Sequence, residues 1–389
     1  MTRRLLVVAA LVATVAFVGP ASVSAGNGNQ PDVQGMGGGY LPQCLKFTEL
    51  KEWNCYLDGM KRVVLASKNP ASLLPDLDVL SRNTGGYLAA SCHMMMHVIG
   101  RDYALVHHVT LETLQQYLPH SNDPGCSAGF GMGLVMGLSS AITLGGPKGA
   151  NAICGKAPTR FRNYSCYHAL GHAYMRYYHG QLSYSLKSCN ALGSQALDCV
   201  QGAFHDYWLG LSGQDGAKYT HGLPRTARQL CAREPVRDAV ACWFRYYVTI
   251  PPKRTPSSAS RIEALCTGLR DARRFGCIAS ASVVSSSDPG VQFDVCRRLP
   301  ADDVVACLHG VGYVDIPPSL SSLVSFIGRC STLPAGTRAA CFVWVGTAMG
   351  VMTNGSFAKS GCPSLHSPSA RADCVAGVKL MSQPLVTFA

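Results

Sequence analysis

The spacing of the 18 cysteines constrains the fold of this chain more than any other feature. Sixteen of them form eight neighbouring pairs whose members stand 10 to 12 positions apart. The pairs are Cys44/Cys55, Cys154/Cys166, Cys189/Cys199, Cys231/Cys242, Cys266/Cys277, Cys296/Cys307, Cys330/Cys341 and Cys362/Cys374. Cys92 and Cys126 remain, and by elimination we expect them to pair with each other. The absence of a Cys-x-x-Cys motif counts against zinc ribbons and iron–sulfur clusters.

The start of the chain indicates export. Arg3 and Arg4 precede an apolar stretch over residues 5–18, and the small residues of Val23-Ser24-Ala25 follow. This order is typical of a signal peptide, and we predict that residues 1–25 are removed. In an exported chain the cysteines are expected to form disulfides. We therefore predict a secreted, periplasmic or cell-surface protein with no integral membrane span in the mature chain.

The cysteines also mark a repeat. From Cys126 onward, the second cysteine of each pair recurs at steps of 30 to 43 residues, a period typical of helical arrays. A proline stands four residues after the first cysteine at Pro158, Pro235, Pro300 and Pro334, and proline is favoured at the start of a helix. The first cysteine is thus expected to end one helix, and the second to lie about two turns into the next. We predict an all-α fold, a disulfide-stapled array of repeated helical hairpins that forms a solenoid or a closed helical toroid.

In repeat length and cysteine placement the chain resembles disulfide-stapled relatives of tetratricopeptide-like arrays. That resemblance implies a concave face that binds partners, and we take no specific function from it.

Composition divides the chain into five segments. We predict a signal peptide at 1–25, a glycine-rich flexible leader at 26–40 and histidine-rich helical repeats at 41–250. A Pro/Ser linker or loop at 251–260 then leads to histidine-poor helical repeats at 261–389. Residues 126–146 are apolar and uncharged, and their glycines favour a buried helix over a membrane span. The net charge of +12 is scattered, which predicts no nucleic-acid partner but is compatible with an anionic small molecule or a cell-surface polymer.

Two stretches share a His-x3-His-x3-Arg motif. His93, His97 and Arg101 follow Cys92, and His168, His172 and Arg176 follow Cys166. Residues four positions apart on a helix share one face, so each stretch presents two imidazoles and a guanidinium on the same side. Two such motifs, each just after a repeat cysteine, are unexpected by chance, although His93 and His97 are offset by one position from His168 and His172.

A third helix extends the pattern, because Gln201 and His205 follow Cys199 at the same offsets as His168 and His172 follow Cys166. His309 takes the first of these offsets after Cys307. Paired imidazoles one turn apart bind a divalent transition metal such as zinc, copper or iron. The predicted ligands are His93, His97, His168, His172 and His205, arranged as one tetrahedral site or, with His205, a two-metal site.

These residues predict an exported metal-binding protein. If the protein is an enzyme, we expect a metal-dependent hydrolase or oxygenase that acts on an anionic substrate. His205, Asp102 and Asp206 are candidates for acid–base or ligand roles, and Arg101 and Arg176 for orienting an anionic substrate. The alternative is a non-catalytic helical-repeat scaffold for a protein, glycan or metal ion. A purely structural interpretation of any single histidine is that it forms a hydrogen bond with a buried polar group.

Overall fold

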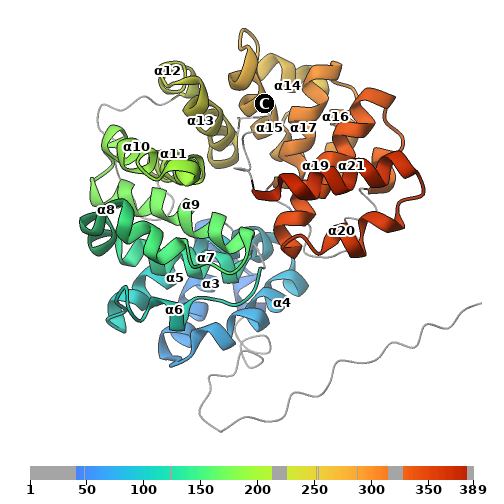
Figure 1. Ribbon diagram of the computed structural model, residues 1–389. Coiled ribbons are helices and arrows are strands. Elements are labelled where there is room, and N and C mark those ends of the chain that lie inside the picture. Colours follow the sequence, from blue (N-terminus) through green and yellow to red (C-terminus); the bar gives the residue numbers. More distant parts are fainter. Residues whose placement is uncertain are drawn as a thin grey trace, which may run out of the picture.

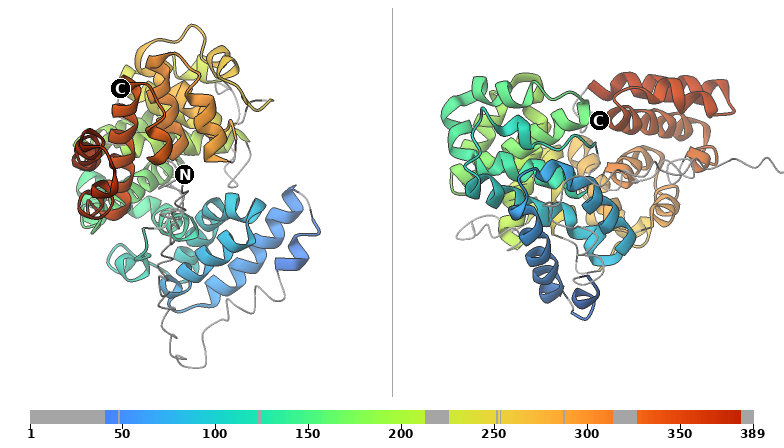
Figure 2. Two further views of the ribbon diagram at one scale, coloured as in Figure 1. Left: turned by 90° about the vertical axis from the view of Figure 1, so that its right-hand side faces the viewer. Right: turned by 90° about the horizontal axis from the view of Figure 1, so that it is seen from below.

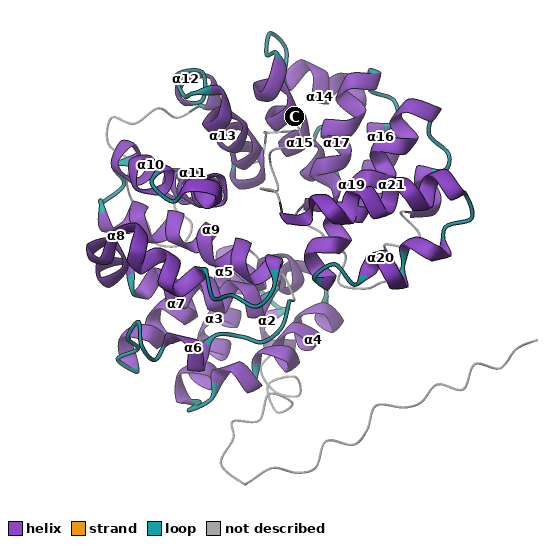
Figure 3. Cartoon of the chain, viewed as in Figure 1, coloured by secondary structure: helices purple, strands orange, loops and turns teal. Residues whose placement is uncertain are grey.

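A computed structural model describes residues 41–382 except 48, 123–124, 213–225, 251, 253, 287 and 314–326. The predicted signal peptide and leader lie outside the described residues. All regular secondary structure in the described part of the chain is helical, so the prediction of an all-α fold is confirmed (Figure 3).

The helices that pack on one another in succession are α3 (Glu49–Ala66), α5 (Gly86–Val106), α7 (Cys126–Gly137), α9 (Arg160–Tyr177), α11 (Ala196–Ser212), α13 (Val236–Thr249), α15 (Asp271–Val283), α17 (Ala301–Tyr313), α19 (Ala335–Thr353) and α21 (Pro368–Lys379). Between them lie α2 (Leu41–Cys44), α4 (Leu74–Thr84), α6 (Leu114–Tyr117), α8 (Ser139–Cys154), α10 (Leu182–Asn190), α12 (Ala227–Leu230), α14 (Ala259–Leu265), α16 (Pro289–Cys296) and α20 (Phe357–Ser360). Short 3-10 turns occupy Pro70–Ser72, Gly193–Gln195, Cys362–Ser364 and Leu380–Ser382.

All nine predicted disulfides are present, including the one between Cys92 and Cys126. In the hairpin of α12 and α13, Cys231 directly follows the short helix and Pro235 precedes the long one. Cys242 is the seventh residue of α13, two turns in as predicted. Each disulfide of this kind fixes a short helix against the long helix that follows it.

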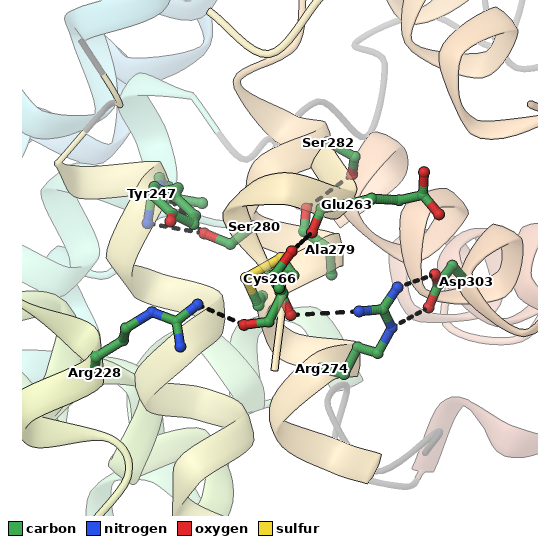
Figure 4. The surroundings of a disulfide bond; sticks show 12 residues. Arg228, Tyr247, Glu263, Cys266, Arg274, Ala279, Ser280, Ser282 and Asp303 are labelled. Carbon is green, nitrogen blue, oxygen red and sulfur yellow. Dashed lines mark hydrogen bonds and ion pairs between the residues drawn. A yellow bond between two sulfur atoms is a disulfide. The ribbon is translucent and has the colours of Figure 1, made fainter. Parts of the chain in front are cut away.

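Polar contacts around one such disulfide tie its hairpin to both neighbours (Figure 4). Cys266 follows α14 and is bonded to Cys277 in α15. Arg274 of α15 donates to the carbonyl oxygen of Cys266 at 3.3 Å and to the carboxylate oxygens of Asp303 in α17 at 2.9 and 2.6 Å. On the other side, Ser280 accepts a hydrogen bond from the backbone N–H of Tyr247 in α13 at 2.9 Å. Successive hairpins are therefore joined by side chains as well as by apolar packing.

The succession of long helices from α9 to α19 returns to α9 (Figure 1). The amide of Asn122 donates to the carbonyl oxygen of Met352 at 2.9 Å, and Nε of Arg160 donates to that of Met381 at 3.1 Å. Val351 of α19 packs with Phe161 at the start of α9. Helices α3 and α4 extend away from this ring (Figure 2). These contacts place α9 between α7, α11 and α19, at the junction of the two ends of the ring.

The apolar stretch at 126–146 is two helices rather than one. The chain bends at Leu138, and the axes of α7 and α8 differ by 91°. Among the described residues no single helix is long and apolar enough to cross a membrane. Helices α7 and α8 reach that length and apolar character only when they are counted together. Residues Cys126 to Met136 of α7 are all buried, so the prediction of a buried helix holds for that half.

Breaking the longest disulfide loop is expected to destabilise the protein more than breaking a short one. Cys92 and Cys126 are 34 positions apart, and Cys231 and Cys242 are 11 apart. In the chain-entropy treatment the two bonds contribute about 3.8 and about 2.8 kcal/mol to the free energy of unfolding. Denaturant unfolding of the two double-alanine variants measures the difference. Equal losses would show that loop entropy does not determine the effect.

Candidate metal centre

Two glycines bring α9 and α11 into backbone contact. A Cβ atom at Gly202 would overlap the carbonyl oxygen of His168, and a Cβ at Gly171 would overlap that of Cys199. Only a residue without a side chain allows helices to approach this closely. As a result His168 and His172 on α9 lie directly beside His205 on α11.

Three imidazoles converge at this crossing. Nε2 of His168 lies 3.2 Å from Nε2 of His172 and 3.3 Å from Nδ1 of His205. All three ligand atoms lie within 4.8 Å of one another, and the side chains are 2%, 0% and 8% exposed. In a tetrahedral zinc site with Zn–N bonds of about 2.0–2.1 Å, neighbouring nitrogens are about 3.3 Å apart. The short separations therefore match the edges of such a site.

Asp206 holds the ring of His172 in place. Its Oδ1 lies 3.0 Å from Nδ1 of His172, and both side chains are fully buried. Nδ1 of His172 therefore donates to the carboxylate, which leaves the lone pair on Nε2 facing the cluster. Nη2 of Arg176 lies 3.5 Å from the same oxygen. A carboxylate that orients an imidazole in this way is the usual outer partner of a metal-bound histidine.

The second His-x3-His motif lies against the first. On α5, Nε2 of His93 and Nε2 of His97 are 3.1 Å apart, and the ring of His97 meets that of His172 edge-on with centroids 5.2 Å apart. Helix α5 reaches this position by backbone contact with α7, because a Cβ at Gly129 would overlap the carbonyl oxygen of His93. The structure thus places the pair of His93 and His97 beside the cluster of His168, His172 and His205.

The environment favours the uncharged form of three of these histidines. Burial lowers the pKa of His97, His168 and His205 well below 6.5, and neighbouring histidines add to the effect. The guanidinium of Arg245 also lowers the pKa of His168 and of His205. Neutral imidazoles are the form that binds metal, because protonation would occupy the lone pair.

Sequence reasoning missed Arg245 and Tyr164. Arg245 of α13 is 6% exposed, and its Nη2 donates to the hydroxyl of Tyr164 at 2.9 Å and to Oε1 of Gln201 at 3.2 Å. The same atom lies 3.5 Å from Nδ1 of His168. Tyr164 precedes His168 by one helical turn, a spacing that could have revealed it. Arg245 stands three positions after Cys242, one position beyond the offset shared by His168 and Gln201. The comparison of offsets after each cysteine therefore did not identify it.

The proposed catalytic residues fall into two groups. Arg176 and Asp206 belong to the cluster, as described above. Asp102 instead accepts from Nζ of Lys61 on α3 at 2.6 Å and lies 3.4 Å from Arg101, in a group of partly exposed charges. The contacts of Asp102 with Lys61 and Arg101 give Arg101 and Asp102 the character of a surface ion pair.

The ring of His309 packs against Phe275 and Trp344, with ring centroids 5.1 and 6.3 Å away.

The metal-free protein is expected to lose stability as the pH falls below about 6.5. The pKa of His97, His168 and His205 is lower in the folded protein than the unfolded value of 6.5. The unfolded chain then binds more protons, so the stabilisation is complete above pH 6.5 and declines below it. Each group contributes a slope of up to about 1.4 kcal/mol per pH unit.

Urea unfolding in the presence of a chelator, between pH 7.5 and 5, measures this slope. The His97→Gln variant should show a smaller slope than the wild type, because one of the groups that gain a proton on unfolding is gone. An identical slope in the two proteins would contradict the assignment.

A search with this chain finds no matching family model, no matching curated protein and no matching solved structure. The histidine cluster is therefore the feature of this chain from which a function can be inferred.

Proposed function

We propose that this chain is an exported metalloprotein that binds a divalent transition metal through Nε2 of His168, Nε2 of His172 and Nδ1 of His205. The nine disulfides are typical of an oxidising compartment, and the predicted signal peptide agrees with export. Zinc, copper and iron all accept imidazole ligands, and the nitrogen spacing suits tetrahedral zinc.

One observation carries the proposal, and it is the position of Nε2 of His168 between two other imidazole nitrogens at 3.2 and 3.3 Å. An imidazole nitrogen offers a single in-plane site, either a proton or a lone pair. It can therefore form one good hydrogen bond to these neighbours but not two. A buried polar contact left unsatisfied is costly. A metal ion among the three nitrogens satisfies all three lone pairs at once.

The residues around the cluster suit catalysis of a hydrolytic kind. A metal held by three protein ligands supplies an open coordination position and activates a water molecule there. Asp206 fixes the orientation of His172, and Arg176 fixes Asp206 in turn. Arg245 adds a buried positive charge beside His168, which favours an anionic substrate over a neutral one. Arg245, rather than Arg101, is thus the residue that we assign to substrate selection.

A non-catalytic metal-binding scaffold is the second candidate. The three ligand side chains are at most 8% exposed, and such burial favours an ion that is held permanently. Turnover separates the two candidates. A hydrolase should cleave anionic esters only when loaded with metal, whereas a scaffold should bind the metal and cleave none of them.

Elemental analysis of the full chain, secreted and oxidised by its host, tests the metal site. We expect at least one transition-metal ion per chain, and a loss of metal in the His205→Gln variant. His120→Gln is the matched control, because His120 is exposed in a loop. A wild-type protein that is folded, contains no metal and binds none when zinc is added would overturn the proposal.

Replacing Asp206 by asparagine is expected to weaken zinc binding at least about 10-fold, because the amide lacks the charge that makes His172 a stronger ligand. Asp102→Asn is the matched control, since Asp102 pairs with Lys61 and should leave the affinity unchanged. Competition with a chelating dye measures both affinities. Equal affinities in the two variants would remove Asp206 from the metal site.

A further inference from the structure

The pair formed by His93 and His97 has the geometry of a second set of metal ligands. Nε2 of His93 and Nε2 of His97 are 3.1 Å apart, close to the tetrahedral edge found in the first cluster. Both nitrogens come from one helix at positions i and i+4, so the backbone of α5 places the two side chains on the same face. His97 is fully buried and His93 is partly exposed, so the pair joins the buried cluster to the solvent side.

This pair is adjacent to the first cluster but is not part of it. The rings of His97 and His172 meet at a centroid distance of 5.2 Å and an interplanar angle of 76°. The three nitrogens of the first cluster lie within 4.8 Å of one another, in a group that includes neither His93 nor His97. Among the described residues, Nδ1 of His97 is buried without a hydrogen-bond partner. No partner at Nδ1 therefore fixes the tautomer of His97, and with the proton on Nδ1 the lone pair on Nε2 would face Nε2 of His93, where a metal ion would bind both nitrogens.

We infer that the metal centre is dinuclear, with a second transition-metal ion bound by Nε2 of His93 and Nε2 of His97 beside the ion held by His168, His172 and His205. This inference rests on the proposed function of the first cluster. The ligands of both ions are imidazoles, a set that suits zinc, copper or nickel and does not suit magnesium or calcium. Two protein ligands leave room for a solvent molecule or a substrate anion shared between the ions, the arrangement used by two-metal hydrolases.

The competing arrangement is a single ion with His97 as its fourth ligand. In that case the site would be closed, like a structural zinc site, and His93 would act only as a neighbour. The two arrangements differ in the number of ions per chain and in the effect of replacing His93. Both quantities can be measured without knowledge of the substrate.

The first experiment counts Co²⁺ ions in the full-length oxidised protein after chelator treatment, reloading and gel filtration. We expect two ions in the wild type, one in His93→Gln, and two in the His120→Gln control. A single ion in both the wild type and His93→Gln would overturn the dinuclear centre and leave the proposed function standing. A wild type that binds no ion would overturn both. Loss of every ion in a folded His93→Gln variant would assign His93 to the first ion and also overturn the inference.

The second experiment detects the proximity of the two ions directly. Two neighbouring Cu²⁺ ions couple magnetically, so the electron paramagnetic resonance of the copper-loaded wild type should account for far less than its chemically measured copper. The His93→Gln variant should show the full intensity of one isolated ion. Full intensity for both ions in the wild type would place them far apart and contradict the inference.

Discussion

Replacing Gly202 by alanine is expected to destabilise the protein by about 2–3 kcal/mol and to abolish metal binding at the three-histidine cluster. The added methyl group would overlap the carbonyl oxygen of His168, which is backbone and cannot rotate away. Helix α11 would have to move away from α9. His205 would then separate from His168 and His172, and the three nitrogens could no longer share one ion.

A second glycine offers a matched control for this substitution. Gly149 lies in α8, where a Cβ would make only an ordinary contact, 3.7 Å from the carbonyl oxygen of Ile142. Gly149→Ala should raise the free energy of unfolding by up to about 1 kcal/mol, because alanine favours the helix. Denaturant unfolding and zinc titration of both variants provide the comparison. If Gly202→Ala were as stable as Gly149→Ala, the close crossing of α9 and α11 would be incorrect.

Zinc is expected to stabilise the wild-type protein strongly. Free zinc at about 1,000 times its dissociation constant adds about 4 kcal/mol to the free energy of unfolding of a protein that binds it only when folded. The melting temperature should therefore rise by several degrees when zinc is added to chelator-treated protein. The cause is the linkage between ligand binding and folding, so the rise should grow with the zinc concentration.

The His172→Ala variant should lose nearly all of this rise, because it removes one of the three ligands together with the contact to Asp206. Its melting temperature without metal will also be lower, so the quantity to compare is the change that zinc produces in each protein. Differential scanning calorimetry measures that change. A rise of equal size in His172→Ala and in the wild type would place zinc elsewhere on the chain.

Local patterns in the sequence predicted the parts of the fold that depend on local chemistry. The spacing of Cys231 and Cys242 around Pro235 is set within one hairpin, so the sequence alone indicated both the disulfide and the start of α13. The i and i+4 spacing of His168 and His172 is likewise a property of a single helix. The shared offset of His205 after its cysteine worked because α11 repeats the geometry of α9.

Features that depend on how distant helices meet were not predictable in the same way. The contact between Asn122 and Met352 closes the ring across 230 positions, and nothing in either segment identifies the other. Asp102 directly follows Arg101, and Asp206 directly follows His205, so the sequence gives the two aspartates similar surroundings. Only the packing of α3 against α5 shows that Asp102 pairs with Lys61 instead of joining the histidines. Arg245 enters the site although it stands one position beyond the offset of Gln201 after its cysteine, so the shared offset did not identify it.

Anomalous X-ray diffraction from crystals of the zinc-loaded protein, recorded on both sides of the zinc absorption edge, tests the central claim most directly. The account predicts a strong anomalous peak about 2.0–2.1 Å from Nε2 of His168, Nε2 of His172 and Nδ1 of His205. Peaks found only at exposed histidines such as His120, with none among these three nitrogens, would contradict it.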